Sequence, residues 1–288
     1  MNGVLVINKS LGYTSRDVVN IVGKKLNTKK IGHTGTLDPN ASGVLVLCVG
    51  QALKLIELMD CYDKEYFAEI ILGTETDTLD MDKNATIIRD EKVNIDNEKI
   101  INVVNSFKKK YMQEVPKYSA VKVNGRKLYD YARSNIPVEL PKKEVHIKDI
   151  QIIDDIKSID KKIYFKIKCT VSKGTYIRSL VRDIGYELSC PAVMNSLERT
   201  RIGNFDINNS YTLDDIEKNN YQLISILDAF PNIPKVFVDN DIAKKISNGM
   251  ILDNFFNAEM AFIIDSNDNL LALYKNIDNK SRPYKMFV

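Results

Sequence analysis

Residues 32–43 read GHTGTLDPNASG, and this stretch decides how the rest of the chain is interpreted. Pro39 disfavours the helical region for the residue before it, so Asp38 is expected in an extended conformation. Gly35 and Gly43 permit sharp turns on either side. An Asp-Pro pair is ordinarily a turn whose carboxylate bonds its own backbone. In this setting, however, the carboxylate is expected to lie on a restricted loop between a helix and a strand.

The first half of the chain alternates between strand and helix patterns around this loop. The elements expected there are a strand at 3–8, a helix from Thr14 or Ser15 to about Leu26, a long loop at 27–42, a strand at 44–49, a short helix at 52–59, a strand at 64–72 and a helix at 97–107. Long ordered loops inside a compact domain are often functional. The loop is therefore the first place to look for chemistry.

The second half is expected to hold an insertion, a helix-and-sheet segment and a small final module. The predicted elements are an irregular insertion at about 111–141, paired strands at 144–153 and 161–171, a helix at 176–188 introduced by Gly174, and extended chain at 192–200. Pro231 and Pro234 mark a boundary. Beyond it, a strand near Val236, a helix at 239–247 and a hairpin at 260–264 and 270–274 are expected. The predicted domains are residues 1–232 and 233–288.

Composition places the chain among soluble globular proteins, because it has 288 residues of which 44% are hydrophobic and 27% charged. The opening residues MNGVLVINKSLGYTS read as a strand and not as a signal peptide, so a cytoplasmic location is expected and no membrane contact. The 4 cysteines are widely spaced and stand beside only 2 histidines, which argues against a zinc site. No metal is expected.

Basic residues gather in two places, although the net charge is only +3. One group, Lys24, Lys25, Lys29 and Lys30, precedes the loop, and the other lies between Lys108 and Lys127 among tyrosines. Such clusters suit a ligand that carries phosphates. Taken alone, each is also what an ordinary solvated face looks like.

Residues 32–43 resemble the signature loop of bacterial-type tRNA pseudouridine-55 synthases, the TruB family: Gly-His-Thr-Gly-x-Leu-Asp-Pro-x-Ala-[Ser/Thr]-Gly. Five further segments resemble the family in its order: GVLVINKSLGYTS (3–15), KEYFAEIILGTETDTLDMD (64–82), VPKYSAVKVNGRKLYDYAR (115–133), KGTYIRSLVRDIG (173–185) and LERTRIGNF (197–205). The chain departs from the pattern at Ser10, where proline is usual, and at Val115, where the family often has a second proline.

The resemblance implies an α+β pseudouridine synthase fold. It comprises a mixed, largely antiparallel central sheet, an insertion that packs on RNA and a small C-terminal PUA-like β module. The implied reaction converts uridine 55 in the TΨC loop of tRNA to pseudouridine, by base flipping and nucleophilic attack. Attack at C1′, elimination through a glycal and attack at C6 all remain open. No group is oxidised or imported, so no cofactor is expected.

The resemblance also assigns roles to side chains. The catalytic residues are Asp38 as nucleophile, Arg178 as its ion-pair partner and Tyr66, which stacks on the base and helps to remove the C5 proton. Four further residues are expected to bind the substrate: His33, Tyr176, Leu197 and Asp80. The residues expected to contact the RNA backbone are Lys9, Lys29, Lys30, Lys122 and Arg126.

The partner implied by this interpretation is the T-arm stem-loop of tRNA, bound by a monomer that needs no protein partner. Two other functions fit parts of the sequence. One is a tRNA chaperone without chemistry, which would not need a carboxylate at Asp38. The other is the catalytic subunit of a guide-RNA pseudouridylation particle, which would depend on partner proteins.

Overall fold

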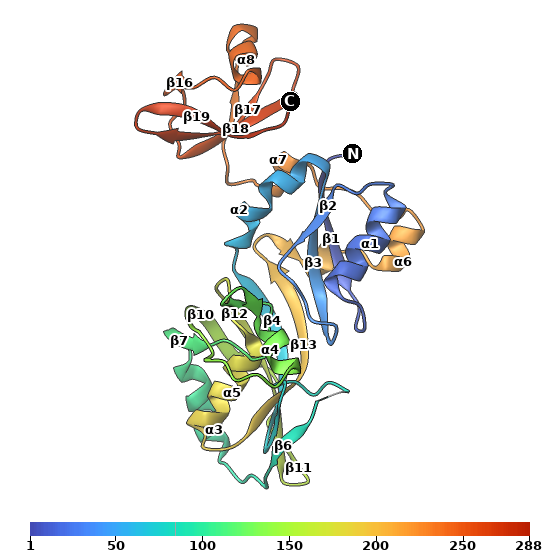
Figure 1. The fold of residues 1–288 in the computed structure, drawn as a ribbon, viewed down its shortest axis with the longest axis vertical. Coiled ribbons are helices and arrows are strands. Elements are labelled where there is room, and N and C mark those ends of the chain that lie inside the picture. Colours follow the sequence, from blue (N-terminus) through green and yellow to red (C-terminus); the bar gives the residue numbers. More distant parts are fainter. Residues whose placement is uncertain (84) are drawn as a thin grey trace.

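A mixed sheet of ten strands forms the centre of the computed structural model, which describes residues 1–83 and 85–288 (Figure 1). Its main path runs β1 (Gly3–Lys9), β3 (Ala41–Val49), β13 (Ala192–Ile202), β4 (Lys64–Leu72), β12 (Lys162–Val171), β10 (Lys142–Ile152) and β7 (Lys110–Glu114). Three short strands pair onto it: β2 (Ile31–Thr34), β11 (Lys157–Ile159) and β14 (Phe205–Asp206). The β13–β3 pair is parallel and the other described pairs of this sheet are antiparallel, which confirms the predicted fold class.

The helices cover the sheet in two groups (Figure 1). Helices α3 (Asn97–Ser106) and α5 (Ile177–Glu187) pack on β4, β10 and β13, where they enclose a core that includes Phe165 and Leu180. Helices α1 (Ser15–Lys25) and α6 (Leu213–Glu217) pack on β1 and β3 around Leu5 and Val22. A capping box of Thr14 and Asp17 begins α1 where the sequence predicts.

Short helical turns complete the first part of the chain. A 3₁₀ turn at Gly50–Leu55 runs into α2 (Ile56–Asp60), and α7 (Ile226–Ala229) precedes the final module. A second 3₁₀ turn lies at Ile207–Asn209. None of the helices among the described residues is both long and apolar enough to cross a membrane.

The C-terminal residues form their own sheet of five strands, in the order β15 (Lys235–Phe237), β17 (Met260–Ile264), β18 (Leu270–Ile277), β19 (Lys280–Met286) and β16 (Leu252–Asp253), with α8 (Asn240–Ser247) beside it. Phe262 and Leu273 belong to the same buried cluster as Val44 and Phe230 of the first part. The ammonium of Lys54 also donates to the carbonyl of Met286. The small module therefore docks on the larger part through a shared apolar core.

Several expected elements differ from those in the structure. Residues 27–42 were expected as one loop, but β2 pairs with β3 inside it and β3 already begins at Ala41. The expected insertion at 111–141 starts with an edge strand of the main sheet, β7. The rest of it forms a hairpin of β8 (Lys122–Val123) and β9 (Arg126–Lys127), followed by α4 (Leu128–Arg133). A hairpin of β5 (Thr74–Thr76) and β6 (Ile87–Asp90) was not expected at all.

The parallel contact between β3 and β13 leaves no room for a side chain at Gly43. Gly43 has a φ of +101°, and a Cβ there would lie 2.2 Å from the carbonyl oxygen of Arg199. This close approach sets the distance between the two strands that frame the loop carrying Asp38. The glycine predicted to permit a turn therefore permits strand pairing as well.

Replacing Gly43 with alanine is expected to lower the free energy of unfolding by about 2–4 kcal/mol, because the new methyl group meets backbone atoms and the φ is positive. Gly125→Ala is the matched control, since Gly125 also has a positive φ, of +80°, but a Cβ there would meet no other atom within 4 Å. Urea unfolding followed by circular dichroism measures both variants. Equal losses would show that φ alone, and not the strand contact, determines the cost.

Candidate active site

Asp38 and Arg178 meet across the molecule in an ion pair. Asp38 lies between β2 and β3, and Arg178 is the second residue of α5. A guanidinium nitrogen of Arg178 lies 2.9 Å from a carboxylate oxygen of Asp38. The Arg178 side chain is 11% exposed and that of Asp38 is 46% exposed, so the cation is buried while the carboxylate remains accessible.

The same guanidinium fixes two further segments. It donates to the carbonyl oxygens of Thr78 and Tyr118, each at 3.2 Å. Arg178 therefore joins the loop after β5, the segment after β7 and the loop of Asp38. Because these three acceptors surround it, the guanidinium is held in one orientation.

The loop that carries Asp38 is anchored on both sides of the carboxylate. The hydroxyl of Ser15 accepts from the amide of Leu37 at 2.9 Å and donates to the carbonyl of Leu37 at 3.1 Å. The amide of Gly12 donates to the carbonyl of Pro39 at 2.8 Å. Arg199, which is 1% exposed, donates to the carbonyls of Val44 at 2.8 Å and Gly35 at 3.0 Å. The backbone around Asp38 is thus fixed by groups from β13, from the turn before α1 and from the first residue of α1.

Lys9 belongs to this support and not to the protein surface. It is completely buried, and its ammonium donates to the carbonyls of Ser10 at 3.0 Å and Tyr13 at 2.8 Å. Burial lowers the pKa of Lys9 to about 8, against the opposing effect of the nearby Asp38 carboxylate. The prediction that Lys9 contacts the RNA backbone is at odds with this position, because its charged group is already enclosed by the turn that it orders.

A cavity of about 540 Å³ opens beside the ion pair, a size typical of ligand pockets. Its lining residues are Gly12, Asp38, Pro39, Asn40, Thr78, Asp80, Asp82, Lys83, Tyr118, Tyr129, Arg133 and Arg178. Tyr118, Tyr129 and Arg133 were not singled out from the sequence as site residues, although they lie within a segment that resembles the family. The guanidinium of Arg133 lies over the ring of Tyr129, 5.4 Å from its centroid.

Asp80 lies in the wall of this cavity and is 6% exposed. Burial raises the pKa of Asp80 to about 6, the nearby guanidinium of Arg178 opposes this rise, and the carboxylate of Asp38 adds to it. The three residues therefore form one electrostatic group in which two carboxylates share the influence of a single guanidinium.

Tyr66 and Leu197 lie behind the loop. Both pack in the apolar cluster that contains Leu37 and Ala41, which lie close to Asp38 on either side of it in the chain. Tyr66 is 7% exposed, and Leu197 on β13 stands opposite Ala41 on β3. The structure thus brings both predicted residues to the loop, although neither lines the 540 Å³ cavity.

Tyr176 and His33 lie on different elements around the loop. Burial raises the pKa of Tyr176. The positive charge of Arg178 opposes this rise and the negative charge of Asp38 adds to it, so the Tyr176 ring is within electrostatic reach of the ion pair.

His33 is half-buried on β2, opposite Leu47 of β3. Burial, followed by the charges of Arg16 and Arg199, lowers the pKa of His33, which favours the neutral ring.

The residues expected to contact RNA phosphates differ in availability. Lys29, Lys30 and Lys122 are exposed. Arg126 is instead engaged within its own segment, where it donates to the carbonyl of Asp130 at 2.9 Å and to the hydroxyl of Ser134 at 2.6 Å.

Gln113 on β7 was not predicted to belong to the site. It is 1% exposed, and its side-chain amide pairs with the backbone of Tyr176: the oxygen accepts from the Tyr176 amide at 2.8 Å and the nitrogen donates to the Tyr176 carbonyl at 3.2 Å. The same nitrogen donates to the hydroxyl of Tyr111 at 2.8 Å. Tyr176 precedes α5 and makes no side-chain cap, so Gln113 fixes the start of the helix that carries Arg178.

Two family profiles match this chain. The N-terminal domain of the TruB family of pseudouridylate synthases matches residues 23–177, and the C-terminal domain of tRNA pseudouridylate synthase B matches residues 178–228. The chain is 42% identical to "tRNA pseudouridine synthase B" of Bacillus subtilis (strain 168) over 88% of this chain and 84% of that one. It is 38% identical to the protein of that name in Staphylococcus aureus (strain MRSA252), over 99% of each chain.

Solved structures share the fold. The chain superposes on one described as "Structure of H/ACA RNP bound to a substrate RNA containing 2'-deoxyuridine" with a TM-score of 0.70 and 23% identity, covering 99% of this chain and 85% of that one. A Cbf5-Nop10-Gar1 complex gives a TM-score of 0.70 at 24% identity, with coverage of 99% and 85%. At this identity the likeness concerns the fold alone.

The raised pKa of Asp80 predicts a pH-dependent stability. The folded protein holds the Asp80 proton up to about pH 6, whereas an unfolded aspartate loses it near pH 3.9. Between these values the folded state binds more protons, so the contribution of Asp80 to stability falls as pH rises. Asp80→Asn should remove about 2 kcal/mol of this decline between pH 4.5 and 6.5. Urea unfolding of both proteins at pH 4.5 and 6.5 measures it, and parallel pH profiles would contradict it.

Proposed function

This chain belongs to the TruB family of pseudouridylate synthases, and on that premise we propose that it isomerises uridine 55 in the TΨC loop of tRNA with Asp38 as its nucleophile. The single observation that carries the proposal is the ion pair of Asp38 and Arg178 at the edge of a 540 Å³ cavity. A carboxylate that is reachable yet gripped by a buried guanidinium is suited to attack on a bound nucleoside.

The reaction breaks the N1–C1′ bond of uridine, turns the uracil within the site and joins C5 to C1′. C5 then loses its proton and N1, freed from C1′, gains one, so the product is an isomer of the substrate. Asp38 can add to C1′, can remove a proton on the route through a glycal, or can add to C6. In each case the carboxylate must reach the nucleoside in one orientation, which Arg178 and the anchored loop supply.

We assign the predicted roles to the side chains around the loop. Tyr66 stacks on the uracil and helps to remove the C5 proton through its hydroxyl. Leu197, in the same apolar cluster, forms a wall that keeps water from the detached base. Tyr176 closes the site from the start of α5, and Asp80 contacts the nucleotide from the wall of the cavity.

The target uridine lies inside a folded loop of the RNA and must be extruded before Asp38 can reach it. Flipping a base costs a few kcal/mol, and contacts to phosphates and to the shape of the stem-loop offset this cost. We assign His33 to the flipping step and Lys29, Lys30 and Lys122 to the phosphates. The protein is proposed to act in the cytoplasm as a monomer, without a guide RNA or a protein partner.

Asp38→Asn is expected to abolish pseudouridine formation, because an amide cannot act as the nucleophile, while tRNA binding changes by less than about tenfold. The assay is tritium release from C5-labelled uridine in an unmodified tRNA transcript, with the purified chain alone. Asp154→Asn, at an exposed acid outside the site, should keep wild-type activity. Full turnover by the Asp38 variant would refute the nucleophile. A wild-type chain that binds tRNA without turnover would instead support a chaperone or a partner-dependent particle.

Gln113→Ala is expected to lower kcat by roughly tenfold to a hundredfold, since small displacements of positioned groups have effects of this size. Gln113 acts through Tyr176 and Arg178 and touches no substrate, so tRNA affinity should change little. Tyr111→Phe, the matched control, removes the bonds of the Tyr111 hydroxyl to Gln113 and Asp183 but leaves the pairing of Gln113 with Tyr176, and should retain most activity. Single-turnover rates and filter binding separate the two quantities. A loss of affinity at unchanged kcat would show that Gln113 is not a positioning residue.

A further inference from the structure

The turn between β1 and α1 exposes two large apolar side chains at the edge of the proposed active site. Residues 10–14 connect the two elements, and within them Leu11 is 63% exposed and Tyr13 is 40% exposed. Single exposed apolar residues are common on protein surfaces. In this turn, however, the two residues flank Gly12, which lines the cavity beside the ion pair. The apolar surface is therefore continuous with the cavity wall.

Hydrogen bonds hold this turn in place. The buried ammonium of Lys9 donates to the carbonyl oxygens of Ser10 at 3.0 Å and Tyr13 at 2.8 Å. The amide of Gly12 donates to the carbonyl oxygen of Pro39, in the catalytic loop, at 2.8 Å. Gly12 has a φ of +86°, which favours glycine at this position. Because the backbone is fixed on both sides, the two apolar side chains stay in contact with solvent.

The ring of Tyr13 has no aromatic or cationic partner within residues 1–83 and 85–288. Tyr129, which lines the cavity, differs in this respect, because the guanidinium of Arg133 lies 5.4 Å from its ring centroid. The ring of Tyr13 is therefore available to a flat group from outside the chain.

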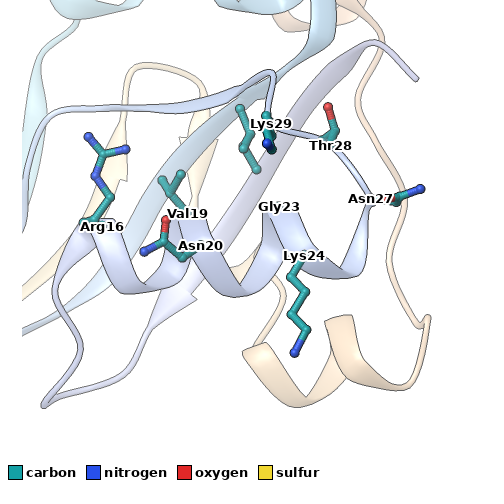
Figure 2. Close-up of a pocket in the computed structure, with 9 residues that line it drawn as sticks. Arg16, Val19, Asn20, Gly23, Lys24, Asn27, Thr28 and Lys29 are labelled. Carbon is teal, nitrogen blue, oxygen red and sulfur yellow. The ribbon is translucent and has the colours of Figure 1, made fainter.

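Positive charge follows this apolar surface in the chain. Figure 2 shows Arg16 extending from the first turn of α1, three residues after Tyr13, and its side chain is exposed. Arg16 takes part in no salt bridge among the described residues. Proteins bind single-stranded nucleic acid with this combination of aromatic rings, on which bases stack, and cations. The turn therefore suits a nucleotide better than an apolar protein segment.

An RNA whose uridine occupies the cavity supplies such a nucleotide. When the uridine is extruded, the bases on either side of it lose their stacking contact with it. Because Gly12 belongs to the cavity wall, its two neighbours lie beside the path by which the RNA chain leaves the cavity. Stacking of one base on an aromatic side chain recovers free energy of the same order as base flipping costs.

We propose that Leu11 and Tyr13 form a stacking platform for one of the two bases that flank the target uridine, an inference that rests on the proposed function. Tyr13 supplies the ring, Leu11 supplies a second apolar surface, and the anchored backbone of Gly12 fixes their distance from the cavity. The platform holds the flanking base only when the uridine is extruded, so it lowers the cost of extrusion. Both residues bind substrate and take no part in the chemical step.

The experiment measures binding of a T-arm stem-loop by variants made in the Asp38→Asn background, in which no conversion of the uridine is expected. Tyr13→Ala should raise Kd by about tenfold, because a stacking contact is lost. Leu11→Ala should raise it by a smaller factor. Tyr13→Phe keeps the ring and should stay within about twofold of the parent. Circular dichroism checks that each variant is folded.

Two controls separate stacking from other causes of weak binding. The salt slope of log K should be the same for Tyr13→Ala as for the parent, since no phosphate contact is lost. Tyr186→Ala removes a tyrosine that is 57% exposed and lines no part of the cavity, and it should bind like the parent.

Stem-loops that lack the base on the 5′ or the 3′ side of the target uridine identify the stacked base. With one of these RNAs the effect of Tyr13→Ala should disappear, because the platform then has no base to hold. An unchanged effect with both RNAs, no loss of affinity in Tyr13→Ala, or an equal loss in Tyr13→Phe would overturn the inference. Turnover by the wild-type protein is measured separately, so failure to convert uridine 55 would count against the proposed function and not against the platform.

Discussion

The placement of the Asp38 loop by buried cations is the constraint on which the rest of the structure depends. Arg199 and Lys9 are both fully buried, and both direct their N–H groups at backbone carbonyls and not at carboxylates. Burying a charge is costly unless hydrogen bonds compensate it. In return, each cation satisfies carbonyls that would otherwise lack partners, and Lys9 also lies within electrostatic reach of the Asp38 carboxylate that Arg178 grips.

The loop that carries Asp38 therefore depends on contacts from distant parts of the sequence. Ser15 follows β1, and Arg199 lies on β13. These residues lie in the segments 3–15 and 197–205 that resemble the family, so the resemblance marks parts that act together in space. Gly43 completes the arrangement, because only a residue without a side chain lets β3 approach Arg199 so closely. The geometry at the carboxylate is thus a property of the sheet as a whole.

The sequence predicted the elements whose periodicity is strong and whose ends carry caps. The strand at β4 and the helices α1, α3 and α5 agree with the expected ranges to within two residues at each end. Strand β2 was missed because four residues with one buried side chain carry no alternating pattern, and β3 supplies the pairing. Likewise, β7 is an edge strand whose buried side chain is the polar Gln113. Lys9 was predicted to contact the RNA backbone, and its burial was not foreseen because a charged residue is almost never fully buried. Only the turn beside Lys9 explains why this side chain is buried.

Arg178 was predicted as a partner of Asp38, but the structure shows that pairing is only part of its role. Its guanidinium reaches one carboxylate and two carbonyls, which come from the loop before β3 and from the segments after β5 and β7. Arginine presents five N–H donors in a planar fork, whereas the three donors of lysine share one nitrogen. Because these acceptors come from separate segments, only a wide and rigid donor can hold all three together. The side chain that orients the nucleophile thus also fixes the wall of the cavity that faces it.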